Sequence, residues 1–118
     1  MTWSTARADL ADALRDVNAA GVTVYDHVPV VDQTGVVASI DRSGASSTMT
    51  DWTFIVRVYV RASIPDVQSA QLTVDEMIDA FEAVFDRQSL TATWRTEYLA
   101  EFDVWLTEWS VIYPRQDF

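Results

Sequence analysis

The sequence predicts an α+β fold, a two-layer sandwich in which two helices pack on one face of a mostly antiparallel sheet of four to five strands. Three observations support this prediction. Residues 51–61, DWTFIVRVYVR, alternate in polarity at period two, as a half-buried strand does. Apolar residues recur at three- and four-residue spacing over 66–87, which indicates a long helix. Two aromatic and β-branched segments, 90–99 and 103–113, follow and predict the last two strands, with a turn between them.

The composition fits one domain that spans residues 1–118. The chain is 49% hydrophobic and contains five Trp, four Tyr and five Phe, enough apolar surface for one core. It has no cysteine, so a disulfide framework is excluded. The first residues lack a basic segment followed by an apolar run, and no stretch approaches the roughly 20 apolar residues that span a bilayer. We therefore expect a soluble protein.

The N-terminal third predicts a helix followed by a strand. Ser4 or Thr5 is suited to cap a helix that runs to residue 19 or 20 and ends at Gly21, a residue type favoured at helix C-termini. The next segment, 22–28, is rich in β-branched and aromatic residues and stops at Pro29, as expected of a strand.

The middle of the chain predicts a short strand and a long loop. Residues 36–40 are β-branched or small and favour a strand. Residues 41–50, DRSGASSTMT, are polar and small and include a glycine, which is typical of an exposed hairpin loop. Loops of this length often take part in binding.

The strand at 51–61 should have one buried and one open face. The buried face is expected to consist of Trp52, Phe54, Val56, Val58 and Val60. Because two helices cover only one face of a sheet, the opposite face should remain uncovered. It should carry Arg57, Tyr59, Arg61 and Trp94, together with either Trp105 and Trp109 or Glu108 and Val104. Monomers rarely expose large apolar patches, so this face is predicted to be a subunit interface.

The residues offer no catalytic or metal-binding constellation. The one histidine, His27, neighbours Asp26, but adjacent residues of a strand point to opposite faces, and an ordinary surface histidine is the favoured interpretation. No Asp spacing matches a calcium-binding loop, no G-x-S-x-G motif is present, and three glycines are too few for a phosphate-binding loop. We expect neither an enzyme nor a cofactor.

The chain is strongly acidic. Its formal net charge is −10, and all eight basic residues are arginine. This charge opposes binding to a nucleic-acid backbone or to an acidic membrane. On the predicted long helix, acidic residues follow one another at helical spacing at positions Asp75, Glu76, Asp79, Glu82 and Asp86. Either the stripe is a solvated face that keeps the protein soluble, or it repels DNA or meets a basic partner.

The order of these segments resembles the tail terminator, or tail completion, proteins of long-tailed, siphovirus-type bacteriophages. The segments that carry the resemblance are an initial helix, GVTVYDHVP, a polar hairpin loop, DWTFIVRVYVR, VQSAQLTVDEMIDAFEAVF and two closing aromatic strands. They cover nearly the whole chain. The absence of lysine resembles the usage of a phage that infects a GC-rich host.

The resemblance implies a structural virion protein. Such a protein forms a ring, expected to be hexameric, that caps the tail tube, ends its polymerisation and joins the tail to the head. Its partners would be further copies, the tail tube protein and a head-completion or connector protein, while DNA passes through the lumen without specific binding. The resemblance places it at the head-proximal end of the virion tail, assembled in the host cytoplasm.

This function suggests a role for three groups of residues. The hypothetical subunit interface is Arg57, Tyr59, Arg61, Trp105 and Trp109. The hypothetical tail-tube docking loop is Arg42, Ser43, Gly44, Ser46, Ser47 and Met49. The hypothetical acidic lumen or surface stripe is Asp75, Asp79, Glu82 and Asp86.

Two alternatives stay open at this point. Another head-to-tail connector or neck protein would share the size, the ring assembly and the absence of chemistry. A small non-enzymatic ligand-binding or adaptor domain would also place two helices on a sheet, but it should show a concave apolar pocket and remain a monomer or dimer.

Overall fold

The computed structural model describes residues 2–16, 23–25, 36–61 and 67–115. It contains, in chain order, α1 (Trp3–Arg15), β1 (Thr23–Tyr25), β2 (Val36–Ser47), β3 (Asp51–Arg61), α2 (Val67–Arg87), β4 (Thr91–Leu99) and β5 (Val104–Pro114). The strand order in the sheet is β1-β2-β3-β5-β4. The β1–β2 pair is parallel, and the other three pairs are antiparallel. The predicted α+β class and mostly antiparallel sheet are confirmed.

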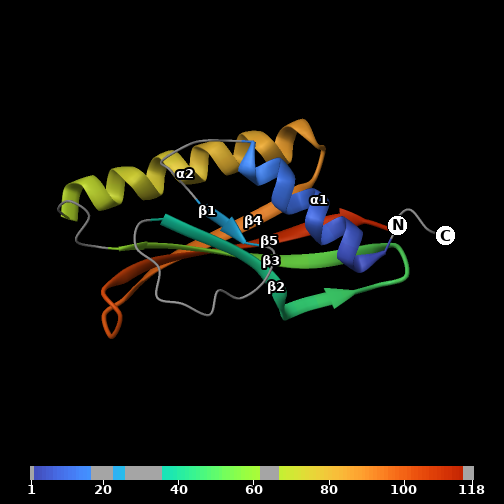
Figure 1. The fold of residues 1–118 in the computed structure, drawn as a ribbon, viewed down its shortest axis with the longest axis horizontal. Coiled ribbons are helices and arrows are strands. Elements are labelled where there is room, and N and C mark those ends of the chain that lie inside the picture. Colours follow the sequence, from blue (N-terminus) through green and yellow to red (C-terminus); the bar gives the residue numbers. More distant parts are fainter. Residues whose placement is uncertain (1, 17–22, 26–35, 62–66, 116–118) are drawn as a thin grey trace.

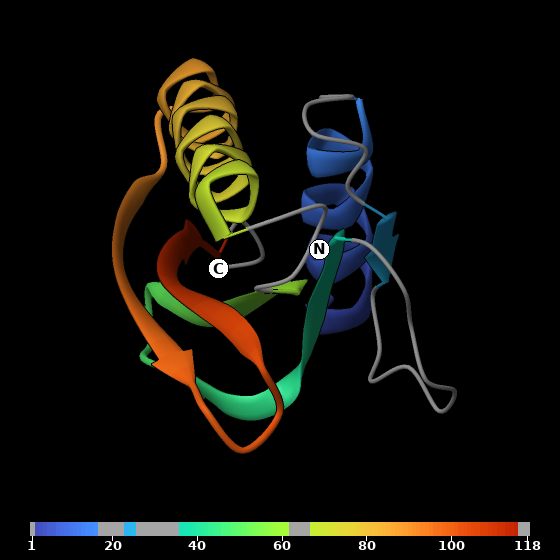
Figure 2. The ribbon, with the colours of Figure 1, turned by 90° about the vertical axis from the view of Figure 1, so that its left-hand side faces the viewer.

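The two helices lie on the same face of the sheet (Figure 1). Figure 2, which views the molecule from one end, shows α1 and α2 side by side above a sheet that curves beneath them. The opposite face of β3, β4 and β5 carries no helix of the described chain. We call this surface the open face.

The central strand β3 has the predicted alternation. Every second residue from Trp52 to Val60 is buried, and every residue between them is half-buried. Branched and aromatic side chains on the buried side meet the apolar stripes of both helices, including Leu10 and Leu14 of α1 and Phe81 of α2. The burial of one face therefore fixes which way β3 is turned.

An aromatic cluster fills the core beneath α2. The Trp109 ring of β5 lies 6.3 Å from the Phe81 ring and 5.1 Å from the Phe85 ring, measured between centroids. At the other end of the core, the ring of Trp3 in α1 lies 4.5 Å from Phe54. Aromatic pairs at these separations add to the stabilisation from burial.

The first helix differs from the prediction at its start. Its N-cap is Thr2, whose hydroxyl accepts a hydrogen bond of 3.2 Å from the Thr5 backbone N–H, so neither Ser4 nor Thr5 is the cap. A threonine hydroxyl at this position satisfies a backbone donor that the helix itself leaves unpaired. The predicted stop at Gly21, most of the predicted strand at 22–28, and His27 with Asp26 lie outside the described residues.

The predicted long loop at 41–50 is wrong, because most of it belongs to β2. Ser46 and Ser47 pair with Thr53 and Trp52 of β3, and the turn itself comprises residues 48–50. Residues 42–45 stand opposite the single residue Phe54, so β2 contains a pronounced bulge. Pairing with β2 satisfies backbone N–H and C=O groups of β3 that would otherwise lack partners. This gain outweighs the low strand propensity of the small polar residues in β2.

The later elements begin and end close to their predicted bounds. The long helix α2 ends at Arg87 as expected, and β4 and β5 each start one residue later than predicted. Between them the chain reverses at residues 100–103, where Asp103 has a positive φ of 54°.

Replacing Trp109 by alanine should lower the free energy of unfolding by about 3–5 kcal/mol, because this 1% exposed indole fills the space beneath α2. Urea denaturation followed by circular dichroism measures the loss. The matched control is Trp94→Ala. Trp94 stands opposite Trp109 but is 45% exposed, so its loss should be about half as large. Equal losses would contradict the packing described here.

Candidate functional site

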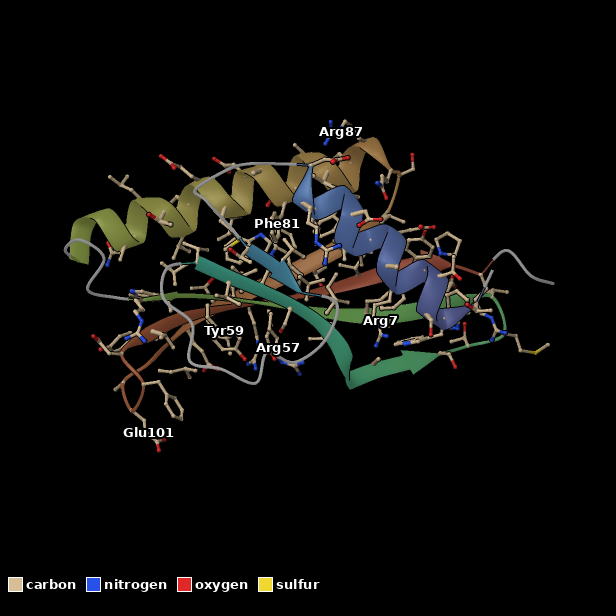
Figure 3. All side chains as sticks on the ribbon, in the orientation of Figure 1. Arg7, Arg57, Tyr59, Phe81, Arg87 and Glu101 are labelled. Carbon is tan, nitrogen blue, oxygen red and sulfur yellow. The ribbon has the colours of Figure 1, made fainter. Side chains whose placement is uncertain are left out.

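The open face presents a row of charged side chains across three strands. Arg57 of β3 stands opposite Glu108 of β5, which in turn stands opposite Arg95 of β4. Residues directly opposite in a sheet share a face, so the three side chains project together. In Figure 3, Arg57 and Tyr59 lie on the side of the sheet away from α2, whereas Phe81 lies between α2 and the sheet.

The three residues form one ion-pair network, which we call the arginine–glutamate row. Glu108 Oε2 accepts a 3.1 Å hydrogen bond from Arg57 Nε, and Oε1 accepts bonds of 3.2 and 3.0 Å from Arg95 Nε and Nη2. The Arg57 and Glu108 side chains are largely buried, at 19% and 24% exposed, whereas Arg95 is 72% exposed. The row therefore offers one accessible cation on a network that is otherwise satisfied within the chain.

The surroundings of Glu108 favour its ionised form. The hydrogen bond from Arg95, followed by the charge and hydrogen bond of Arg57, holds the pKa of Glu108 below its ordinary value of 4.5, although burial acts in the opposite direction. At neutral pH the row thus contains two cations and one anion, and the exposed Glu97 adds a second carboxylate to the same face beside Arg95.

The bulge of β2 lies against this row. Gly44 has a φ of +78°, a conformation that costs other residues about 1–2 kcal/mol. A Cβ at Gly44 would stand 3.0 Å from Ile55 Cγ1 and 3.2 Å from Arg57 Nη2. Glycine is thus required here both by the backbone conformation and by the close approach to β3.

A hollow of about 210 Å³ opens beside the row. Its lining comprises Ile55, Thr93, Arg95, Glu108 and Ser110, which the strand register places on the open face, together with parts of Trp94 and Trp109. Further along the same face, Ile112 is an exposed apolar residue and stands opposite Thr53. The open face thus combines apolar surface with arginine.

Two residues of the predicted interface lie on the wrong face for that role. Trp105 and Trp109 stand opposite Val60 and Val56, which belong to the buried side of β3, and Trp109 is a core residue. Of the two predicted sets of β5 residues, Glu108 and Val104 are the ones on the open face. Trp94, opposite Trp109, also lies on the helix side. Arg57, Tyr59 and Arg61 are on the open face as predicted.

The residues of the predicted docking loop lie partly in a strand and partly in a turn. Arg42, Ser43, Gly44, Ser46 and Ser47 belong to β2, and Met49 occupies the turn, where it is exposed. The turn is well fixed: the Thr48 N–H donates to the Asp51 carbonyl at 2.8 Å, and Arg115 Nη1 donates to the Thr48 carbonyl at 3.2 Å. The site left for docking is therefore a rigid hairpin tip, near the start of α1 in Figure 1.

The predicted acidic stripe lies on the helix layer, apart from the open face. Asp75, Asp79, Glu82 and Asp86 are all exposed on α2. Glu82 Oε1 accepts a 3.0 Å hydrogen bond from Trp94 Nε1, so the stripe runs along the side of α2 that faces β4. Glu82 and Asp86 also border a hollow of about 420 Å³ between α2 and β4.

Sequence reasoning missed the turn between β4 and β5 as a surface feature. Phe102 at this turn is 63% exposed and is flanked by the exposed residues Glu101 and Asp103. The Tyr98 hydroxyl donates a 2.7 Å hydrogen bond to Asp103 Oδ1, and this bond is the main reason that the pKa of Tyr98 is raised. An apolar residue between two acids in a predicted turn is the signal that could have identified it.

Within residues 2–16, 23–25, 36–61 and 67–115, no three His, Asp or Glu side chains gather as metal ligands. Over the same residues, no helix is long and apolar enough to cross a bilayer.

Fold and surface together define a small α+β domain in which one sheet face bears arginines and is covered by neither of the described helices. No family model matches the chain. No curated protein matches it either. Among solved structures, a chain of the "Virion of native gene transfer agent (GTA) particle" is similar over 95% of this chain and 92% of its own length, with a TM-score of 0.55 and 14% sequence identity. At this identity, the likeness shows a shared fold.

Replacing Glu108 by glutamine should lower the free energy of unfolding by about 1 kcal/mol at pH 7, because both arginines lose the negative charge of the carboxylate they share. The pKa of Glu108 is depressed in the folded state, so its contribution is present above its unfolded pKa and is lost as pH falls through the folded pKa. The difference from the wild type should therefore shrink below about pH 4.5. Urea titrations from pH 3 to pH 7 measure it.

The exposed Glu97, on the same face of β4, supplies the control for that experiment. Glu97→Gln should change stability less than Glu108→Gln at pH 7. A pH-independent effect of Glu108→Gln would contradict the role assigned to the ionised carboxylate.

Proposed function

We propose that this protein is a structural component of a phage-type virion, without catalytic activity. The observation that carries the proposal is the open face, a sheet surface that no described helix covers and that exposes Ile112 and Arg95. Surfaces of this kind are buried against neighbouring subunits. The fold shared with a chain of a virion particle supports the same class.

Within this class, we propose the tail terminator role that the sequence resemblance implies. Copies of the chain form a ring, expected to be hexameric, at the head-proximal end of the tail, where the ring ends growth of the tail tube and receives the head. A ring requires a heterologous contact, in which one patch binds a different patch of the neighbour. The open face supplies one of these patches, with Arg57, Tyr59, Arg61 and Ile112 as its members.

The acidic stripe has a role in this arrangement. DNA must pass through the ring without binding, and carboxylates repel its phosphates. Asp75, Asp79, Glu82 and Asp86 lie on the helix layer, so a ring built through the open face leaves them available to line the lumen. A connector elsewhere in the neck is the second candidate, because the similar chain belongs to a whole virion particle, which is equally compatible with that position.

The open face can be tested with Ile112→Asp, which places a charge on an exposed apolar position of that face. Self-association should weaken by at least about tenfold, since burying an unpaired carboxylate costs more than 1.4 kcal/mol. Sedimentation velocity and native mass spectrometry measure association, both free and on purified tail tubes. Circular dichroism should show an unchanged fold.

The matched control is Leu72→Asp, which alters an exposed apolar residue on α2, in the other layer. It should assemble like the wild type. If both variants assemble normally, the open face is not the interface.

The hairpin tip can be tested with Met49→Asp. Its exposed side chain lies on the turn between β2 and β3, which the backbone contacts of Thr48 and Arg115 hold in place, so the fold should be unaffected. If the tip docks on the tail tube, tails assembled with this variant should lose their uniform length, as measured by electron microscopy in a complementation assay. Tails of normal length would remove the tip from the docking role.

A further inference from the structure

The turn between β4 and β5 is an acidic projection with an aromatic tip. Phe102 exposes 63% of its surface between Glu101 and Asp103, which give the turn a charge of −2. Figure 3 places Glu101 at the outer end of the hairpin, on the side of the sheet away from α2. The tip therefore projects toward the side to which the open face is turned.

This tip is held in one conformation. The Phe102 N–H donates to the Leu99 carbonyl at 3.1 Å, and the Tyr98 hydroxyl donates to Asp103 Oδ1 at 2.7 Å. The Tyr98 ring packs against Trp105, with 5.4 Å between centroids. A preorganised turn loses little conformational entropy when it binds, which favours a contact surface.

The hollow on the open face has the complementary chemistry. Ile55 contributes apolar lining, and the accessible Arg95 forms part of its wall. The 72% exposed Arg95 is the accessible cation at this hollow, on a chain whose total charge is −10. Its volume of about 210 Å³ exceeds the roughly 150 Å³ in which a protein cavity holds benzene.

The tip cannot reach the hollow of its own chain. The turn ends where β5 begins, and Glu108, the nearest β5 residue that lines the hollow, is five residues beyond Asp103, or about 17 Å in an extended strand. The hollow that receives the tip must therefore belong to another copy. If each copy uses its tip on one neighbour and its face on another, the contact is heterologous and generates a ring or a filament, whereas a reciprocal contact would close a two-fold dimer.

We propose that the turn at 100–103 of one copy docks on the open face of the next copy. Phe102 enters the hollow beside Ile55, and Glu101 and Asp103 face the arginine–glutamate row. This contact rests on the proposed ring function and names the two patches that close the ring.

Pairing of two copies along β4, one of the two edge strands of the sheet, is a competing arrangement. It would be symmetric and would bring the side of α2 that carries Glu82 and Asp86 toward the same side of the partner. Like charges then oppose the contact. The tip-to-face contact instead joins opposite charges.

Two charge-inverted variants test the proposal. The tip variant carries Glu101→Arg and Asp103→Asn, which changes the charge of the turn from −2 to +1. Asparagine tolerates the positive φ at 103 and can still accept the Tyr98 hydrogen bond. The face variant carries Arg57→Glu, Arg95→Glu and Glu108→Arg, which inverts the row to −1 while keeping opposite charges adjacent.

Each variant alone should associate at least about tenfold more weakly than the wild type, because its tip and its face now repel. An equimolar mixture should recover wild-type association. In a ring where the two variants alternate, each tip contacts a row of the opposite charge. Native mass spectrometry should find equal numbers of the two chains in the recovered assembly. Failure of the mixture to recover would overturn the proposal.

Two further variants keep the test decisive if the triple substitution does not fold. Arg95→Glu alone changes a mostly exposed side chain, and Phe102→Ser removes the aromatic tip without changing charge. Both should weaken association by at least about tenfold. If both associate normally while Ile112→Asp does not, this contact is wrong and the ring function stands. If the wild type never associates, free or on tail tubes, the proposed function itself fails.

Discussion

The constraint on which the structure depends is the alternation of side chains along β3. This strand has hydrogen-bonded neighbours on both sides, β2 and β5, so its residues can face only the helices or the open side. A slip of one residue would turn Arg57 and Arg61 into the core and expose Phe54. The burial of Phe54 against α1 and the ion pair of Arg57 with Glu108 oppose such a slip from both faces.

The arginine–glutamate row is stable on the open face because its charged groups are mutually satisfied. Glu108 accepts a hydrogen bond from the largely buried Arg57, and Arg95 shares the same carboxylate. Isolated burial of Arg57 would be costly. The same arrangement leaves the Arg95 guanidinium accessible beside apolar surface. The requirement for internal stability thus also sets the electrostatic character of the candidate interface.

The sequence predicted the elements with strong periodicity, namely β3 and α2, and their faces followed directly. It could not decide the face of β5, because both alternating sets there are largely apolar. The pairing of Glu108 with Arg57, a contact between strands distant in sequence, decides it. The extension of β2 was missed because residues 42–47 have little strand propensity of their own. Phe102 was missed because a single exposed residue has no periodicity.

The two layers of the domain separate two kinds of surface that an assembly around DNA must keep apart. Carboxylates such as Asp79 lie on α2, whereas the arginine–glutamate row lies beyond the sheet, on the opposite side of the core. If the row and the acidic stripe lay on the same layer, a neighbouring subunit bound at Arg95 would also cover the stripe. The stripe could then no longer face the DNA. In the proposed ring, the hydrophobic core therefore also separates the open face, which binds a neighbouring subunit, from the acidic stripe, which repels DNA.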